Sequence, residues 1–175
     1  DGKGYLFISV GERGEKQEAQ DPTNHQGTIL RLHDDGRVPA DNPFVGRAGY
    51  RPEIWAYGIR NPQGLTLHPS TGELWEAEHG PRGGDEINVI EPGRNYGWPV
   101  VSYGINYAGT VLTALKAKEG MEQPLHYWVP SIATSGLAVY DGDRFPRWKG
   151  HVFVGGLAGL HLARVAFDGH RVTET

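Results

Sequence analysis

The sequence predicts an all-β protein built from repeated antiparallel sheets. Three observations lead to this prediction. The 175 residues include 26 glycines and 12 prolines without any low-complexity stretch. Apolar runs are short and end at turn signals, and a Gly-x-aliphatic-aromatic pattern recurs along the chain. Frequent turns between short apolar runs are typical of hairpins rather than of long helices.

The expected strands share aromatic and branched side chains, or alternation of apolar and polar residues, and each ends near a turn. In chain order they are residues 4–11, 28–32, 53–57, 65–67, 73–77, 87–90, 136–140, 152–154 and 160–167. The Pro69-Ser70-Thr71-Gly72 turn joins two of them as a hairpin. Residues 37–52 contain three prolines and are expected to be irregular, while residues 111–122 are the best helix candidate.

The repeated pattern occurs at residues 4–7, 72–75 and 150–153. Repeats of antiparallel strands suggest the blades of a β-propeller, whose blades typically run roughly 40–50 residues. The wider spacing here is explained by long loops between strands. The chain then holds about three blades, whereas closed propellers have roughly 4–8. We therefore expect residues 1–175 to be a partial propeller, a piece of a single larger domain.

Composition excludes several classes of function. A net charge of −4 provides no basic footprint for nucleic acid, and no apolar run approaches the ~20 residues that span a bilayer. The absence of cysteine excludes disulfides and thiolate metal sites but indicates no compartment. The chain opens and closes within expected β structure, which again suggests part of a longer protein.

The first candidate site is the loop containing Arg60, Asn61 and Gln63. A guanidinium beside two amides suits carboxylates or polarised carbonyl oxygens. The alternative is a surface arginine beside a turn-forming Asn-Pro pair.

The second candidate site is the glycine-rich acidic loop of residues 80–86. Calcium takes oxygen ligands from carboxylates and backbone carbonyls together, so this loop is a calcium candidate, although EF-hand spacing is absent. A solvated turn is the alternative. The adjacent Asp85 and Glu86 should point to opposite faces of a strand, which argues against a two-carboxylate glycosidase.

The motifs at these loops resemble those of the soluble quinoprotein aldose sugar dehydrogenases, which use pyrroloquinoline quinone (PQQ). They are WAYGIRNPQG, EHGPRGGDEIN, NYGWP and YGINYAG, and the similarity extends over essentially the whole chain. The resemblance implies a six-bladed β-propeller with quinone and sugar at one mouth. It also implies oxidation of aldoses at C1 to lactones by hydride transfer to the quinone, in a periplasmic or secreted enzyme.

By motif, Arg60 and Asn61 match residues that hold the quinone, with Gln63 assigned beside them and Tyr107 matching a quinone-contacting tyrosine. Arg60 would stabilise negative charge that develops on the quinone oxygens. The backbone carbonyls of Gly80 and Pro81 match ligands of a calcium ion that polarises the quinone.

Glu86 and the backbone carbonyl of Tyr96 match a second, structural calcium site. The expected partners are an aldose substrate and an external electron acceptor, with a homodimer as an option.

Two departures from the family pattern are expected to matter. The catalytic histidine of the family would precede Asp1, by about seven positions, and Glu12 resembles the carboxylate that orients it. Ala158 stands where the family often has a lysine on the quinone. The chain alone should therefore lack a full active site, and a non-catalytic, calcium-binding propeller of the same lineage is the alternative function. A calcium-dependent lactonase or glycosidase would need a second converging carboxylate or a histidine pair, which the sequence does not reveal.

Overall fold

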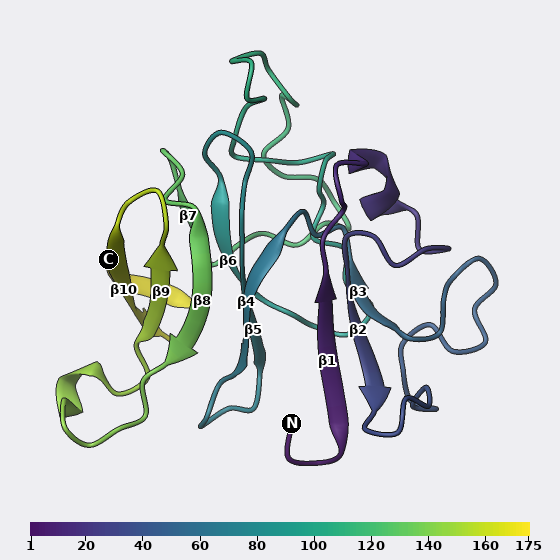
Figure 1. Ribbon diagram of the computed structural model, residues 1–175, viewed down its shortest axis with the longest axis horizontal. Coiled ribbons are helices and arrows are strands. Elements are labelled where there is room, and N and C mark those ends of the chain that lie inside the picture. The colour runs from purple at the N-terminus through teal and green to yellow at the C-terminus, as the bar shows by residue number, and fades with distance from the viewer. The chain divides into compact units, whose positions relative to one another are not determined.

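The computed structural model describes residues 1–175 and confirms the all-β prediction (Figure 1). Its strands are β1 (Tyr5–Val10), β2 (Thr28–His33), β3 (Ile54–Tyr57), β4 (Pro62–Leu67), β5 (Leu74–Glu78), β6 (Asp85–Val89), β7 (His126–Trp128), β8 (Thr134–Val139), β9 (Val152–Gly156), β10 (His161–Asp168) and β11 (Arg171–Glu174). They form three antiparallel sheets in the orders β1-β2-β3, β4-β5-β6-β7 and β11-β10-β9-β8. Three sheets agree with the repeat count, and the six-bladed ring remains a prediction.

The chain divides into two compact units. The first comprises residues 1–62, 91–102 and 111–123, and the second comprises residues 63–90, 103–110 and 124–175. Two short 3-10 helices, η1 (Lys16–Gln20) and η2 (Pro146–Trp148), are the only helices. Neither has the length or the apolar character that a membrane span requires.

The first unit is organised around the sheet β1-β2-β3. Leu30, Phe44 and Ile54 form its buried cluster, and residues 37–52 are irregular, as predicted. Gln20, at the end of η1, donates from Nε2 to Asn95 Oδ1 (3.0 Å) and to the Trp98 carbonyl (2.7 Å). Hydrogen bonds to η1 therefore hold residues 95–99 in place.

The second unit contains the two four-stranded sheets, and its core lies between them. Trp75, Ala77 and Ile87 pack with Val152, Val154 and Val165. Because side chains alternate across a strand, Glu76 and Glu78 lie on the face of β5 opposite to Trp75 and Ala77. The core thus determines which side of the sheet carries the acidic residues.

The helix expected at residues 111–122 is wrong. Its polar groups bond to residues 100–102 instead of to the next helical turn: Thr113 Oγ1 donates to the Val100 carbonyl (2.8 Å), and Ser102 N to the Leu115 carbonyl (3.2 Å). Gly120 has φ of +78°, which a helix does not accommodate. Tertiary hydrogen bonds have displaced a weak local preference.

Candidate functional site

The first unit brings Glu12, Arg60 and Asn61 together at the ends of β1 and β3. Glu12 N donates to the Arg60 carbonyl (2.9 Å). A Cβ at Gly11 would lie only 3.3 Å from Asn61 Oδ1, so the glycine permits this close approach. Glu12 is 7% exposed, and its carboxylate accepts from the backbone N–H of Gly14. The backbone of Glu12 therefore adjoins the backbone of Arg60.

The Arg60 guanidinium lies over the ring of Trp98, with Cζ 5.2 Å from the ring centroid. Cation–π contact of this kind holds an arginine in a defined orientation. Trp98 is itself 5% exposed, and its backbone N–H donates to the Gly58 carbonyl (2.8 Å). Sequence analysis missed this role of Trp98, although the tryptophan of the NYGWP motif was the available signal. The contact places the Arg60 guanidinium on the face of a buried aromatic ring.

The second unit contains the loop of residues 80–84, between β5 and β6. Gly80 and Pro81 are buried, and none of the hydrogen bonds in the structure ends on either carbonyl oxygen. Buried carbonyl groups are nearly always paired, so a cation at these two oxygens suits the loop. A Cβ at Gly80 would lie 2.2 Å from the Gly83 carbonyl oxygen, so the tight turn requires glycine at this position. The residues fit the predicted calcium.

Glu86 belongs to a ladder of oxygen-bearing side chains on β5 and β6, a feature that sequence analysis missed. Glu76 pairs with Asn88 and Glu78 with Glu86 in the strand register, so all four lie on one face of the sheet. Asn88 Nδ2 donates to Glu76 Oε2 (3.1 Å), while Glu76 Oε1 and Asn88 Oδ1 are buried without a hydrogen bond. The alternating Glu-x-Glu and Glu-x-Asn spacings were the signal in the sequence.

The ladder concentrates negative charge. Burial raises the pKa of the Glu76 carboxyl well above its usual range, and the Glu78 charge raises it further, although the Asn88 hydrogen bond lowers it. Burial and Glu78 likewise raise the pKa of Glu86. Buried carboxylates persist when they are paired or bind a metal, so the ladder fits a cation at Glu86. No group of three acidic or histidine residues forms a ready-made metal cluster.

The other predicted residues are spread over both units. Tyr96 lies in the first unit, 6% exposed, whereas Glu86 lies in the second, so their shared calcium stays a prediction. Gln63 is exposed on β4, and Tyr107 is 71% exposed on a turn that the Gly109 N to Asn106 carbonyl bond (2.8 Å) closes. Ala158 is exposed on the β9–β10 turn.

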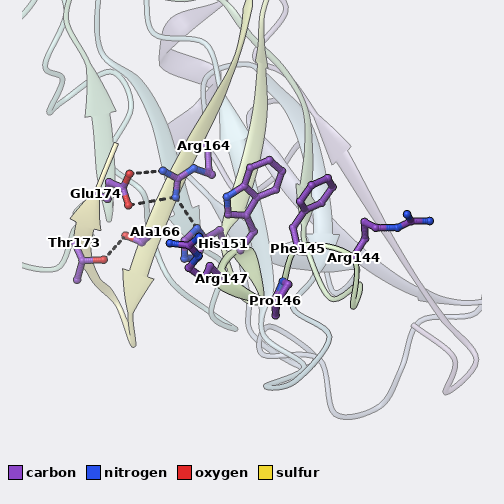
Figure 2. Close-up of a pocket in the computed structure, with 10 residues that line it drawn as sticks. Arg144, Phe145, Pro146, Arg147, His151, Arg164, Ala166, Thr173 and Glu174 are labelled. Atoms are coloured by element: carbon purple, nitrogen blue, oxygen red, sulfur yellow. Dashed lines mark hydrogen bonds and ion pairs between the residues drawn. The ribbon is translucent and has the colours of Figure 1, made fainter.

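A groove of about 800 Å³ adjoins the 144–151 loop and the strands β10 and β11 (Figure 2). None of the predicted site residues lines it. Arg164 inside it is held by the Glu174 carboxylate and by His151 Nδ1 (2.8 Å). The β8–β9 and β9–β10 connections lie at opposite ends of β9, so this groove lies at the other end of the sheet from Ala158. It is not part of the candidate site.

Comparisons with known proteins agree with the motif assignment. The family described as glucose/sorbosone dehydrogenase matches residues 1–175. Aldose sugar dehydrogenase YliI of Escherichia coli (strain K12) is 49% identical over 99% of this chain and 47% of its own. The crystal structure of the soluble aldose sugar dehydrogenase from Escherichia coli in the apo-form superposes with a TM-score of 0.94 at 48% identity, over 98% of this chain and 50% of that one.

A further relative supplies the cofactor comparison. The PQQ-bound form of aldose sugar dehydrogenase from Streptomyces coelicolor superposes with a TM-score of 0.75 at 30% identity, over 98% of this chain and 44% of that one. The chain thus spans about half the length of the relatives that it matches. Because the family model matches residues 1–175 and relatives of 48–49% identity match almost the whole chain, the chain belongs to the glucose/sorbosone dehydrogenase family.

Proposed function

We propose that the full-length protein is a quinoprotein that oxidises aldoses at C1 to lactones, with calcium at its quinone site. The observation that carries this proposal is Arg60, held over Trp98 and next to Glu12 and Asn61. Family membership and the PQQ-bound relative support it. We further propose a single propeller domain that acts in the periplasm or outside the cell.

In this proposal the bound quinone supplies the redox chemistry by accepting hydride from the sugar. Arg60 would bind the quinone oxygens and stabilise negative charge that develops there, and Asn61, Gln63 and Tyr107 would orient the ring. Glu12 orients the histidine base that takes the proton from the sugar C1 hydroxyl. Trp98 keeps Arg60 in place throughout.

The protein groups proposed for calcium are of two kinds. The carbonyl oxygens of Gly80 and Pro81 would hold an ion at the quinone, where it would supply Lewis-acid polarisation. Glu86 and Tyr96 are the residues that the motif resemblance implies for a structural ion, and an ion at the Glu86 carboxylate would offset the negative charge of the β5–β6 ladder.

The direct test uses full-length protein freed of metal and cofactor. Aldoses should reduce an artificial electron acceptor when PQQ and calcium are both supplied, and a chelator or omission of PQQ should abolish the reaction. Absence of activity over a panel of aldoses under these conditions would refute the enzyme assignment.

One observation favours a second candidate. Ala158 provides no cation where the family often has lysine, which suits a non-catalytic, calcium-binding module of the same lineage. Such a protein would bind calcium in a titration yet neither bind PQQ nor oxidise sugars.

A further inference from the structure

Asp85, the first residue of β6, is completely buried and joins two separate segments of the second unit. Its Oδ1 accepts from the backbone N–H of Gly80 (2.9 Å), and its Oδ2 accepts from the N–H of Ile132 (2.9 Å). Ser131 Oγ lies 2.8 Å from both oxygens. Every neighbour thus donates to the carboxylate, an arrangement that an acceptor-only side chain satisfies and an amide does not.

The geometry of the loop explains why this contact matters for Gly80. The peptide group after Gly80 has no N–H, because the next residue is Pro81, so no hydrogen bond of its own fixes the Gly80 carbonyl. The ring of Pro81 fixes only the φ angle of Pro81 itself. Besides the close packing of the turn, Gly80 is constrained by the preceding peptide group, whose N–H is held by Asp85.

The Pro81 carbonyl is fixed differently. It shares a peptide plane with the N–H of Arg82, which donates to the Ile105 carbonyl (3.0 Å), and Ile105 N donates back to the Arg82 carbonyl (3.2 Å). The Pro81 carbonyl is therefore oriented by a β-bridge, whereas the Gly80 carbonyl follows a peptide group whose N–H is held by a buried carboxylate.

The far side of the Asp85 contact is also fixed. The Ile132 carbonyl accepts from Ala158 N (2.9 Å), and the Ala133 carbonyl from Leu157 N (2.9 Å). His79 Nε2 lies 2.5 Å from the Thr134 carbonyl. Asp85 thus fastens the 80–84 loop to a segment that the β9–β10 turn already holds.

We propose that Asp85 is a positioning residue that orients the Gly80 carbonyl so that the Gly80–Pro81 pair binds a divalent cation. This inference rests on the proposed function because it takes that pair as the calcium site. Partners that orient metal ligands typically contribute 10–100-fold to metal affinity.

The test compares full-length wild-type protein with Asp85→Asn and Ser131→Ala. PQQ is titrated into each protein, and its affinity is measured by tryptophan fluorescence, once in saturating calcium and once in chelator. Positioning predicts that Asp85→Asn reduces the calcium-dependent gain in PQQ affinity by about 10- to 100-fold and leaves the value in chelator unchanged. Ser131→Ala, which leaves the Gly80 contact in place, should show a smaller loss in the same direction. A purely structural role would lower both PQQ affinities together.

Asp143→Asn is the matched control, because the same chemical change is made on a side chain that is 97% exposed in the connection between β8 and β9. It should behave as wild type. A folded Asp85→Asn protein with the wild-type calcium dependence would overturn the inference, and if that variant fails to fold, an unchanged Ser131→Ala protein would do the same.

Calcium titration of the PQQ-free protein separates the two proposals. If wild type binds calcium but not PQQ, the quinoprotein function fails. Asp85 is then judged by whether Asp85→Asn weakens a calcium site that Glu86→Gln leaves intact. Loss of that site supports the inference, and its persistence refutes it.

Discussion

At the scale of single residues, Arg60 is the group on which the proposed chemistry most depends. If the full-length protein is the proposed enzyme, Arg60→Ala should lower its kcat on the order of 100-fold, because a charged donor to a developing oxyanion is removed, and should also weaken PQQ binding. Arg60→Lys should recover only part of the activity, since an ammonium lacks the planar contact with Trp98. Steady-state kinetics and PQQ titration measure both effects.

Arg37→Ala is the control for Arg60, because Arg37 is an exposed arginine of the same unit that pairs with Asp35 (2.7 Å). It should leave kcat and PQQ affinity unchanged. Equal PQQ affinity in Arg60→Ala and wild type would remove Arg60 from the site.

A second prediction at this scale concerns Glu53, whose Oε1 lies 2.6 Å from His25 Nε2. Burial raises the pKa of Glu53, but hydrogen bonds from the backbone and His25 outweigh it, and the net pKa is lowered. A lowered pKa stabilises the fold above the unfolded value, about 4.3, and this stabilisation is lost as the pH falls through the folded pKa.

Glu53→Gln should therefore lower the free energy of unfolding by about 1 kcal/mol at pH 7, with the difference shrinking below pH ~4. Urea denaturation of the full-length protein at several pH values measures it. Glu119→Gln, at an exposed position, should show no such difference, and a pH-independent effect of Glu53→Gln would contradict the explanation.

At the scale of elements, we expect the β5–β6 ladder to couple the proposed calcium binding to pH. The raised pKa values of Glu76 and Glu86 mean that the metal-free fold loses stability as the pH rises from the unfolded value toward the folded one. Calcium requires the deprotonated carboxylates, so it should raise Tm more at pH 7.5 than at pH 5. Calorimetry in calcium and in chelator checks this, and Glu86→Gln should reduce the increment. A calcium increment independent of pH would exclude the ladder as its origin.

The elements also show what local sequence could predict. Strands with dense aromatic or branched residues, such as β1 and β9, were predicted to within about two residues. β9 buries every second side chain, and β1 pairs with β2 along its whole length. β7 was missed, because its three residues carry no alternation and its pairing with Asp85, Glu86 and Ile87 is tertiary. The helix at residues 111–122 was wrong for the same reason.

The same distinction between local sequence and long-range contacts applies to the candidate site. Motif resemblance predicted Arg60, Asn61 and Glu12 as site residues, and the structure places the three next to one another. It did not reveal Asp85 as a buried acceptor, because its donors Ser131 and Ile132 are 46 and 47 residues away. Long-range contacts of this kind leave no local pattern.

At the scale of the whole molecule, each unit exposes several large apolar side chains. In the first unit Leu6 and Ile8 of β1 are 48% and 41% exposed, and in the second Leu157, Leu160 and Leu162 are 62%, 91% and 64% exposed. Because the chain spans about half the length of its relatives, we expect the rest of the full-length protein to cover these positions.

Exposed apolar patches promote association, so residues 1–175 produced alone should bind a hydrophobic dye and self-associate at micromolar concentration, whereas the full-length protein should do neither. Light scattering and dye fluorescence distinguish the two, with Leu160→Ser combined with Leu162→Ser expected to reduce both signals in the isolated chain. A monomeric isolated chain that binds no dye would show that these side chains need no cover.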